Sequence, residues 1–231
     1  FLEKIPIPSL LIFIGLGMFF GGNGVLKIAF DNYDIVNITC SICLIFIMFY
    51  GGFGTNLKVA RPVLAPSIVM STLGVAGTAG ALALFAHWVL GLPLLESFLI
   101  GSVISSTDAA SVFNILRSQK LALKYHTDSL LEIESGSNDP MSYMLTTVAV
   151  ALLAGQSISV PLLLARQMVI GLFFGALFGW LAVKLLHQQL LPSQESHTVF
   201  LLSIMVLAYA VPSCFNGNGY LSVYLCGIWI G

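Results

Sequence analysis

Residues 128–140 read Asp128-Ser129-Leu130-Leu131-Glu132-Ile133-Glu134-Ser135-Gly136-Ser137-Asn138-Asp139-Pro140. Four carboxylates therefore lie within a predicted helix, residues 127–154, that continues as a largely apolar run. Six polar positions of this helix fall within about ±40° of one line, at about 100° per residue. They are Asp128, Glu132, Ser135, Asp139, Ser142 and Thr146. The helix thus carries a polar stripe along one face.

The composition places this helix in a membrane. Of the 231 residues, 58% are hydrophobic and only 8% are charged, and the mean hydropathy is +0.97. Soluble domains carry about 25% charged residues, so an ordinary soluble enzyme and a disordered chain are both excluded. The net charge of -1 excludes a basic protein that binds nucleic acid. A polytopic all-α membrane protein remains.

Apolar runs separated by glycine and proline predict eight spanning helices. Their ranges are 5–22, 35–53, 63–90, 94–117, 127–154, 158–186, 198–213 and 219–231. Lysine and arginine gather in alternate loops, as with Lys58 and Arg61 before the third range, so these loops are expected to be cytoplasmic. Because residue 1 is Phe and the last apolar run stops short of about 20 residues, we expect a piece of a longer protein, truncated at both ends.

A second polar segment lies in the fourth predicted span. It reads Gly101-Ser102-Val103-Ile104-Ser105-Ser106-Thr107-Asp108-Ala109-Ala110-Ser111. Hydroxyl and carboxylate side chains compete for backbone hydrogen bonds, so we expect the helix to be interrupted close to Asp108, near the middle of the membrane. Interrupted helices line ion sites in transporters. The alternative is a polar seam in which the serines bond carbonyls one turn back.

The predicted interior of the membrane holds more negative than positive charge. Asp108, Glu132, Glu134 and Asp139 stand against a single well-buried basic candidate, Arg166. The alternative is a set of buried ion pairs that hold the helix bundle together, but one arginine would leave several of these carboxylates without a basic partner. Such a surplus indicates a mobile cation, a proton or both. Pro140 also lacks a backbone donor, which leaves a carbonyl one turn earlier available to a dehydrated cation.

Two motifs together resemble a known family. Ser106-Thr107-Asp108 in one span is followed in the next by Glu134-Ser135-Gly136-Ser137-Asn138-Asp139-Pro140-Met141. This combination is similar to the monovalent cation/proton antiporters of the Asn–Asp branch, which are NhaP-like, and is closest to their potassium/proton, cell-volume-regulation subgroup. The resemblance implies a thirteen-span inverted-repeat fold with a broken helix, usually a homodimer, of which about eight spans are present.

The resemblance also implies a division of the chain and a role for each site residue. Residues 63–154 would form half of the ion-translocating core, residues 1–62 and 187–231 the scaffold and dimerisation spans, and residues 158–186 the linker span. Asp139 would bind the cation and the proton. The other positions that the resemblance assigns are oxygen donors at Thr107, Ser135 and the backbone near Asp108, a brace at Asn138 and a partner for a later arginine at Glu134. From their place on the polar stripe, and not from the resemblance, Glu132 and Asp128 are expected to be structural or access-path carboxylates.

From these residues we predict a secondary antiporter that exchanges K⁺ or Na⁺ for H⁺ by alternating access, with cation and proton competing for Asp139. It would be no enzyme, would need no cofactor, and would lie in the cell membrane, in particular the bacterial inner membrane. A cation channel or uniporter without proton coupling is one alternative; an intramembrane aspartyl protease using Asp108 and Asp139 is another. Tyr50 stands where the family often has an acid, and the sequence leaves K⁺ and Na⁺ undistinguished.

Overall fold

The computed structural model describes residues 9–28, 30–55, 61–107, 123–124, 127–188 and 194–231. Helices occupy all eight predicted segments within these ranges, and the described residues contain no strand. The all-α class is therefore confirmed. The chain forms two compact units, Phe1–Ile42 and Cys43–Gly231.

The first unit contains helix α1, Ser9–Phe20, and the beginning of α2, Tyr33–Gly54. After α1 the chain turns back on the end of the helix, where Leu26 donates to the carbonyl of Phe19. The start of α2 is capped by Asn32, whose side-chain oxygen accepts from the amide of Ile35 at 3.1 Å. An asparagine in this position satisfies one of the amides that a helix start leaves unpaired.

In the second unit, residues 61–90 form one long helical segment of changing pitch. A 3₁₀ turn at Arg61–Val63 leads into α4, Leu64–Val69, then a π-helical turn at Met70–Gly74, then α5, Val75–Leu90. Gly91 ends α5 in the left-handed conformation with φ of 69°, which suits glycine because it has no Cβ.

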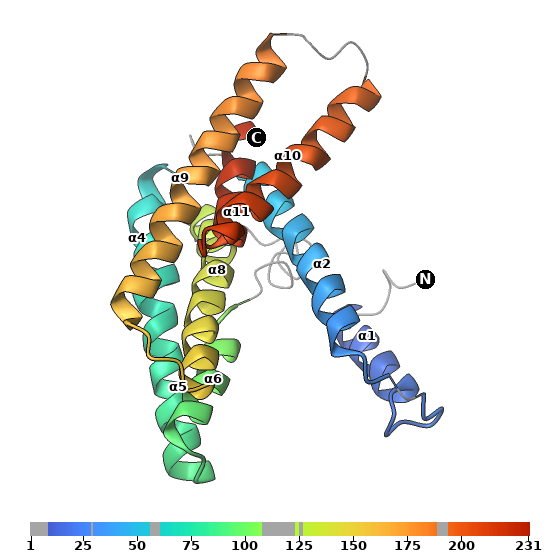
Figure 1. Ribbon diagram of the computed structural model, residues 1–231, viewed down its shortest axis with the longest axis vertical. Coiled ribbons are helices and arrows are strands. Elements are labelled where there is room, and N and C mark those ends of the chain that lie inside the picture. Colours follow the sequence, from blue (N-terminus) through green and yellow to red (C-terminus); the bar gives the residue numbers. More distant parts are fainter. Residues whose placement is uncertain (1–8, 29, 56–60, 108–122, 125–126, 189–193) are drawn as a thin grey trace. The chain divides into compact units, whose positions relative to one another are not determined.

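Helix α6, Leu94–Ile104, returns along α5, and α8, Thr127–Leu153, packs on both of them (Figure 1). The approach of α6 to α5 is close at Gly101, where a Cβ would overlap the carbonyl oxygen of Ala79. A small buried cluster of Val75, Ala79 and Leu145 joins α5 to α8. This three-helix arrangement brings the two polar segments of the sequence together.

The remaining helices of this unit are α9, Val160–His187, α10, Gln194–Cys214, and α11, Gly219–Ile230. Helix α11 packs along α9 and α10. Every fourth residue of α9 at the contact is a glycine, and a Cβ there would come within 2.8 Å of the carbonyl oxygen of Asn218 at Gly171 and of Ser222 at Gly175. Small residues permit this backbone-to-backbone approach.

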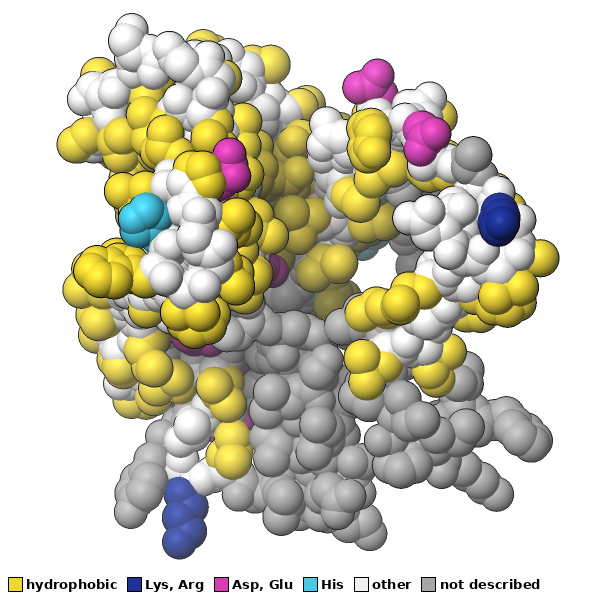
Figure 2. Space-filling model, turned by 90° about the horizontal axis from the view of Figure 1, so that it is seen from below, with side chains coloured by type: hydrophobic (Ala, Val, Ile, Leu, Met, Phe, Trp, Pro, Cys, Tyr) yellow, Lys and Arg dark blue, Asp and Glu magenta, His cyan; other side chains and the backbone are white. Residues whose placement is uncertain are grey.

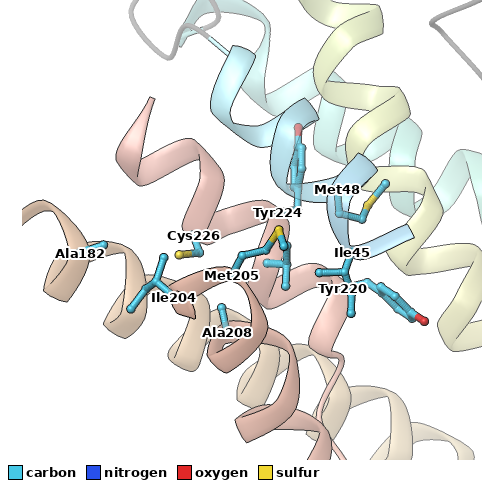
Figure 3. Close-up of a cluster of buried hydrophobic side chains, with 10 residues drawn as sticks. Ile45, Met48, Ala182, Ile204, Met205, Ala208, Tyr220, Tyr224 and Cys226 are labelled. Carbon is cyan, nitrogen blue, oxygen red and sulfur yellow. The ribbon is translucent and has the colours of Figure 1, made fainter. Parts of the chain in front are cut away.

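A hydrophobic cluster holds α9, α10, α11 and the second half of α2 together (Figure 3). Its buried members are Ile45, Met48, Ala182, Ile204, Met205, Ala208, Tyr220, Val223, Tyr224 and Cys226. Most of these side chains belong to α10 and α11, so α11 is the central helix of this packing. Helix α11 also contacts α8.

Four described helical stretches are long and apolar enough to cross a membrane: Tyr33–Gly54, Arg61–Leu90, Val160–His187 and Ser196–Cys214. Leu11–Phe20, Leu94–Ile104 and Gly219–Ile230 are apolar but shorter. Many large hydrophobic side chains are exposed, and they dominate the described surface seen in Figure 2. Such a surface suits lipid rather than water.

Candidate functional site

The end of α6 is the first component of the candidate site. The helix stops at Ile104, and the hydroxyl of Ser105 turns back to the carbonyl of Ser102 at 2.8 Å. Ser106 and Thr107 then continue without helical structure. The predicted interruption is therefore present on this side. Asp108, the remaining member of the motif, lies outside the described residues.

Three side chains of α8 form hydrogen bonds with Thr107. Ser135 donates its hydroxyl to the main-chain carbonyl of Thr107 at 2.9 Å. Asn138 donates its amide to the Thr107 hydroxyl oxygen at 2.5 Å and lies 3.4 Å from the carbonyl. The Thr107 hydroxyl in turn donates to Glu134 at 3.3 Å. Side chains of α8 thus bond both the side chain and the backbone of Thr107, in the non-helical stretch that follows α6.

Asp139 contacts the residue before Thr107. The hydroxyl of Ser106 donates to an oxygen of the Asp139 carboxylate, and it lies 3.3 Å from the side-chain oxygen of Asn138. Asp139 is partly buried, whereas Asn138 has no exposed surface. The carboxylate therefore has a hydroxyl donor from the non-helical stretch that follows α6.

Asn138 joins the elements of the site. Besides its bonds to Thr107, its amide donates to the Glu134 carboxylate one turn earlier on α8, at 3.2 Å. A buried amide needs such partners, because an unpaired polar group in an apolar interior is costly. The resulting network ties Glu134, Thr107 and the Asp139 turn into one unit.

One residue of the predicted polar stripe, Ser142, contacts α6 at Ser102. Ser142 is buried and donates to the carbonyl of Ser102 at 2.6 Å, so it joins α8 to α6. Ser102 donates to Phe98 one turn back at 2.8 Å. The polar-seam alternative therefore describes this end of the contact, one turn from the interrupted helix. Angular position shows which face a residue occupies but not which neighbour covers that face.

The outer carboxylates lie toward the start of α8. Asp128 and Glu132 are both exposed. Glu132 lies near the end of α2, where a Cβ on Gly54 would be 3.8 Å from its carboxylate oxygen. Arg166, the basic residue predicted inside a span, donates to the carbonyl of Phe215 at 3.1 Å.

Two residues of the site were not selected from the sequence. Ser106 belongs to the Ser106-Thr107-Asp108 motif. Its position beside Thr107, in a run of hydroxyl residues, is the sequence feature that could have identified it as a site residue. Asn218 is distant in the chain, yet its amide reaches the carbonyl of Pro140 at 2.9 Å. Nothing local in the sequence indicates that contact.

The oxygen donors assembled here suit a monovalent cation. Carboxylate, hydroxyl and unwound backbone carbonyl oxygens bind such ions in transporters. Among the described residues, no group of His, Cys, Asp and Glu has the arrangement of a conventional metal centre. A cation at this site would be cargo.

Comparison with known proteins identifies the family. The family model described as sodium/hydrogen exchanger, transmembrane, matches residues 1–231. The chain belongs to the transmembrane sodium/hydrogen exchanger family. The resemblance drawn from the two motifs is confirmed.

Curated relatives of this exchanger family carry specific names. The K(+)/H(+) antiporter NhaP of Alkalimonas amylolytica is 39% identical over 232 residues, which is 99% of this chain and 40% of the relative. The K(+)/H(+) antiporter NhaP2 of Shewanella sp. (strain ANA-3) is 35% identical over 234 residues, with the same coverage. The Na(+)/H(+) antiporter 1 of Methanocaldococcus jannaschii is 25% identical over 243 residues, covering 99% of this chain and 55% of the relative.

The chain thus spans about two fifths of the length of the first two relatives, whose coverage is 40%. All three relatives are named as transporters, and none of these names is that of an enzyme.

Proposed function

We propose that the full-length protein is a secondary antiporter that exchanges K⁺ or Na⁺ for H⁺ across the membrane. The observation that carries this proposal is the placement of the Asp139 carboxylate beside Ser106 and Thr107, where α6 loses its helical structure. Unwound backbone in a membrane protein is tolerated where it lines a cavity or an ion site. Two relatives named K(+)/H(+) antiporters make K⁺ the first cation to test.

Competition at one carboxylate couples the two fluxes. A proton and a monovalent cation each neutralise Asp139, so binding of one excludes the other. If the loaded site faces each side of the membrane in turn, cation moves one way and proton the other. Thr107, Ser135 and the backbone near Asp108 supply cation ligands in this proposal, and Asn138 braces them. Glu132 and Asp128 lie on the access path.

Other parts of the proposal come from the family resemblance. Residues 63–154 would be half of the moving core, residues 1–62 and 187–231 the scaffold, and residues 158–186 the linker. The second half of the core would come from spans beyond this chain, including an arginine that pairs with Glu134. We further expect a homodimer, no resident cofactor, and a location in the bacterial inner membrane.

The test is cation-driven proton movement in proteoliposomes that contain the full-length protein and a pH-sensitive dye. We expect exchange in the wild type and none in Asp139→Asn. Asp34→Asn, the same chemical change at an exposed position in the first turn of α2, is the matched control and should exchange normally. Exchange that persists in Asp139→Asn would refute the assignment.

The same assay separates the alternatives. A channel or uniporter would take up cation without moving protons in the opposite direction. An aspartyl protease would cleave a membrane substrate and show no cation dependence. The family match and the names of the relatives favour exchange over both.

A further inference from the structure

Helix α11 contacts α8 on both sides of Asp139, although neither sequence motif includes α11. Asn218 is the residue that precedes the first turn of α11, and its side chain has no exposed surface. The side-chain oxygen accepts from the amide of Leu221 at 3.1 Å, which is an ordinary helix cap. The cap uses only the side-chain oxygen, so the side-chain nitrogen can donate to another partner.

That nitrogen donates to the carbonyl of Pro140 at 2.9 Å. Pro140 directly follows Asp139, and it has no N–H with which to continue the helical hydrogen bonds of α8. The carbonyl of Gly136, one turn earlier, therefore lacks its helical partner, and the turn that carries Asp139 has one internal bond fewer. The bond from Asn218 goes to a different carbonyl, that of Pro140, and ties this turn to α11 from outside the helix. A carbonyl oxygen has two lone pairs and can accept this bond beside a helical one.

Asn218 is itself fixed from a third helix. Its backbone amide donates to the carbonyl of Gln167 in α9 at 3.1 Å. The side chain of Asn218 thus has little freedom to follow α8 if that helix shifts. A donor anchored in this way determines where the Pro140 carbonyl lies.

Tyr224 makes the second contact, nearly two turns further along α11. The side chain is 3% exposed. A Cβ on Gly136 would lie 2.5–2.7 Å from the ring and hydroxyl atoms of Tyr224, so the ring lies directly on the backbone of α8. Gly136 precedes Asp139 by three residues, which places this contact on the opposite side of Asp139 from Pro140.

We propose that Asn218 is a positioning residue for the ion site, holding the Asp139 turn of α8 against α11 together with the contact between Tyr224 and Gly136. This inference rests on the proposed exchange at Asp139 and adds to it a part of the chain outside the two motifs that contain Thr107 and Asp139. Its consequence is functional: loosening either contact should change how tightly the site binds cation and where it titrates, beyond any loss of stability.

Asn218→Ser gives the cleanest test in the full-length protein. Serine remains a good helix cap but is too short to reach Pro140. We expect the half-saturating cation concentration to rise about two- to tenfold, as for the loss of one hydrogen bond, and the pH profile of exchange to shift. Ser213→Ala is the control, because it removes a 2.7 Å bond to the Tyr209 carbonyl within α10, just before the same loop, and leaves the bond from Asn218 to Pro140 in place.

Gly136→Ala probes the second contact, with Gly136→Ala/Tyr224→Ala as its rescue. The single change should weaken cation binding, and removal of the ring should restore part of it. Folded yield by size-exclusion chromatography accompanies each measurement. If Asn218→Ser and Gly136→Ala alter only the yield, and leave the half-saturating concentration and the pH profile at wild-type values, the inference is wrong. Absence of exchange in the wild type would instead refute the proposed function itself and this inference with it.

Discussion

The hydroxyl of Ser135 donates a 2.9 Å hydrogen bond to the main-chain carbonyl of Thr107. The two residues are 28 positions apart, and they come together because α6 ends at Ile104 and leaves the backbone of Thr107 without helical structure. A helical carbonyl would be directed along the helix axis. This one is directed to α8, where it accepts from Ser135, and the preceding residue, Ser106, bonds the carboxylate of Asp139.

We expect Ser135→Ala to weaken cation binding while leaving the protein folded. The change removes both an oxygen donor and the bond that orients the Thr107 carbonyl. The loss of one such bond corresponds to about 0.5–1.5 kcal/mol, or about a two- to tenfold higher half-saturating concentration of K⁺ in the proteoliposome assay. Ser203→Ala, which removes an exposed bond to the carbonyl of Val199, should behave as the wild type.

Asn138→Ala should both destabilise the protein and abolish exchange. The side chain is fully buried and bonds the Thr107 hydroxyl and the Glu134 carboxylate, so its removal deletes both hydrogen bonds, one of them to a charged group. The expected cost is about 1–3 kcal/mol, visible as a lower midpoint of thermal unfolding in detergent. Asn37→Ala, at an exposed position of α2, controls for the loss of an amide. A fully active Asn138→Ala would contradict the network.

Ser142→Ala should separate the seam from the ion site. The serine joins α8 to the carbonyl of Ser102, so its loss should lower stability by about 1 kcal/mol. Cation affinity and the pH profile should stay unchanged, in contrast to Ser135→Ala. The comparison is made by thermal unfolding and by exchange on the same two preparations. A clear change in affinity for Ser142→Ala would return this serine to the ion path.

Gly101→Ala should weaken the packing of α6 on α5. A Cβ at this position would overlap the carbonyl oxygen of Ala79, and forcing extra volume into a packed contact costs about 1–3 kcal/mol. Gly77→Ala is the matched control on α5, because a Cβ there has no atom within 4 Å. That change should stabilise the helix by about 0.5–1 kcal/mol. Opposite shifts in the unfolding midpoint are therefore expected.

Much of the fold could be predicted because helix formation in a membrane is a local property. Apolar length and glycine or proline breaks locate several helices within a few residues: the range predicted at 127–154 is the helix Thr127–Leu153, and the range 158–186 is Val160–His187. The range predicted at 94–117 is an exception, because α6 ends at Ile104. The interruption after Ile104 was equally local, since clustered hydroxyl side chains disfavour a continuous helix. The pairing of segments was harder, as Ser142 shows: helical periodicity assigned it to the polar stripe, whereas it lies buried against Ser102.

The sequence by itself determined the helical class, the membrane environment and the concentration of carboxylates in one segment, because each depends on residue type and spacing along one stretch of chain. Only the tertiary structure decided that Thr107 faces Ser135, that Ser142 seals a seam, and that Asn218 reaches Pro140. Those contacts join residues 28, 40 and 78 positions apart. These contacts depend on how closely the helices pack and on the direction in which each helix presents its side chains. Close glycine contacts, such as those of Gly101 and Gly175, fix that packing, and the periodicity of one helix does not encode it.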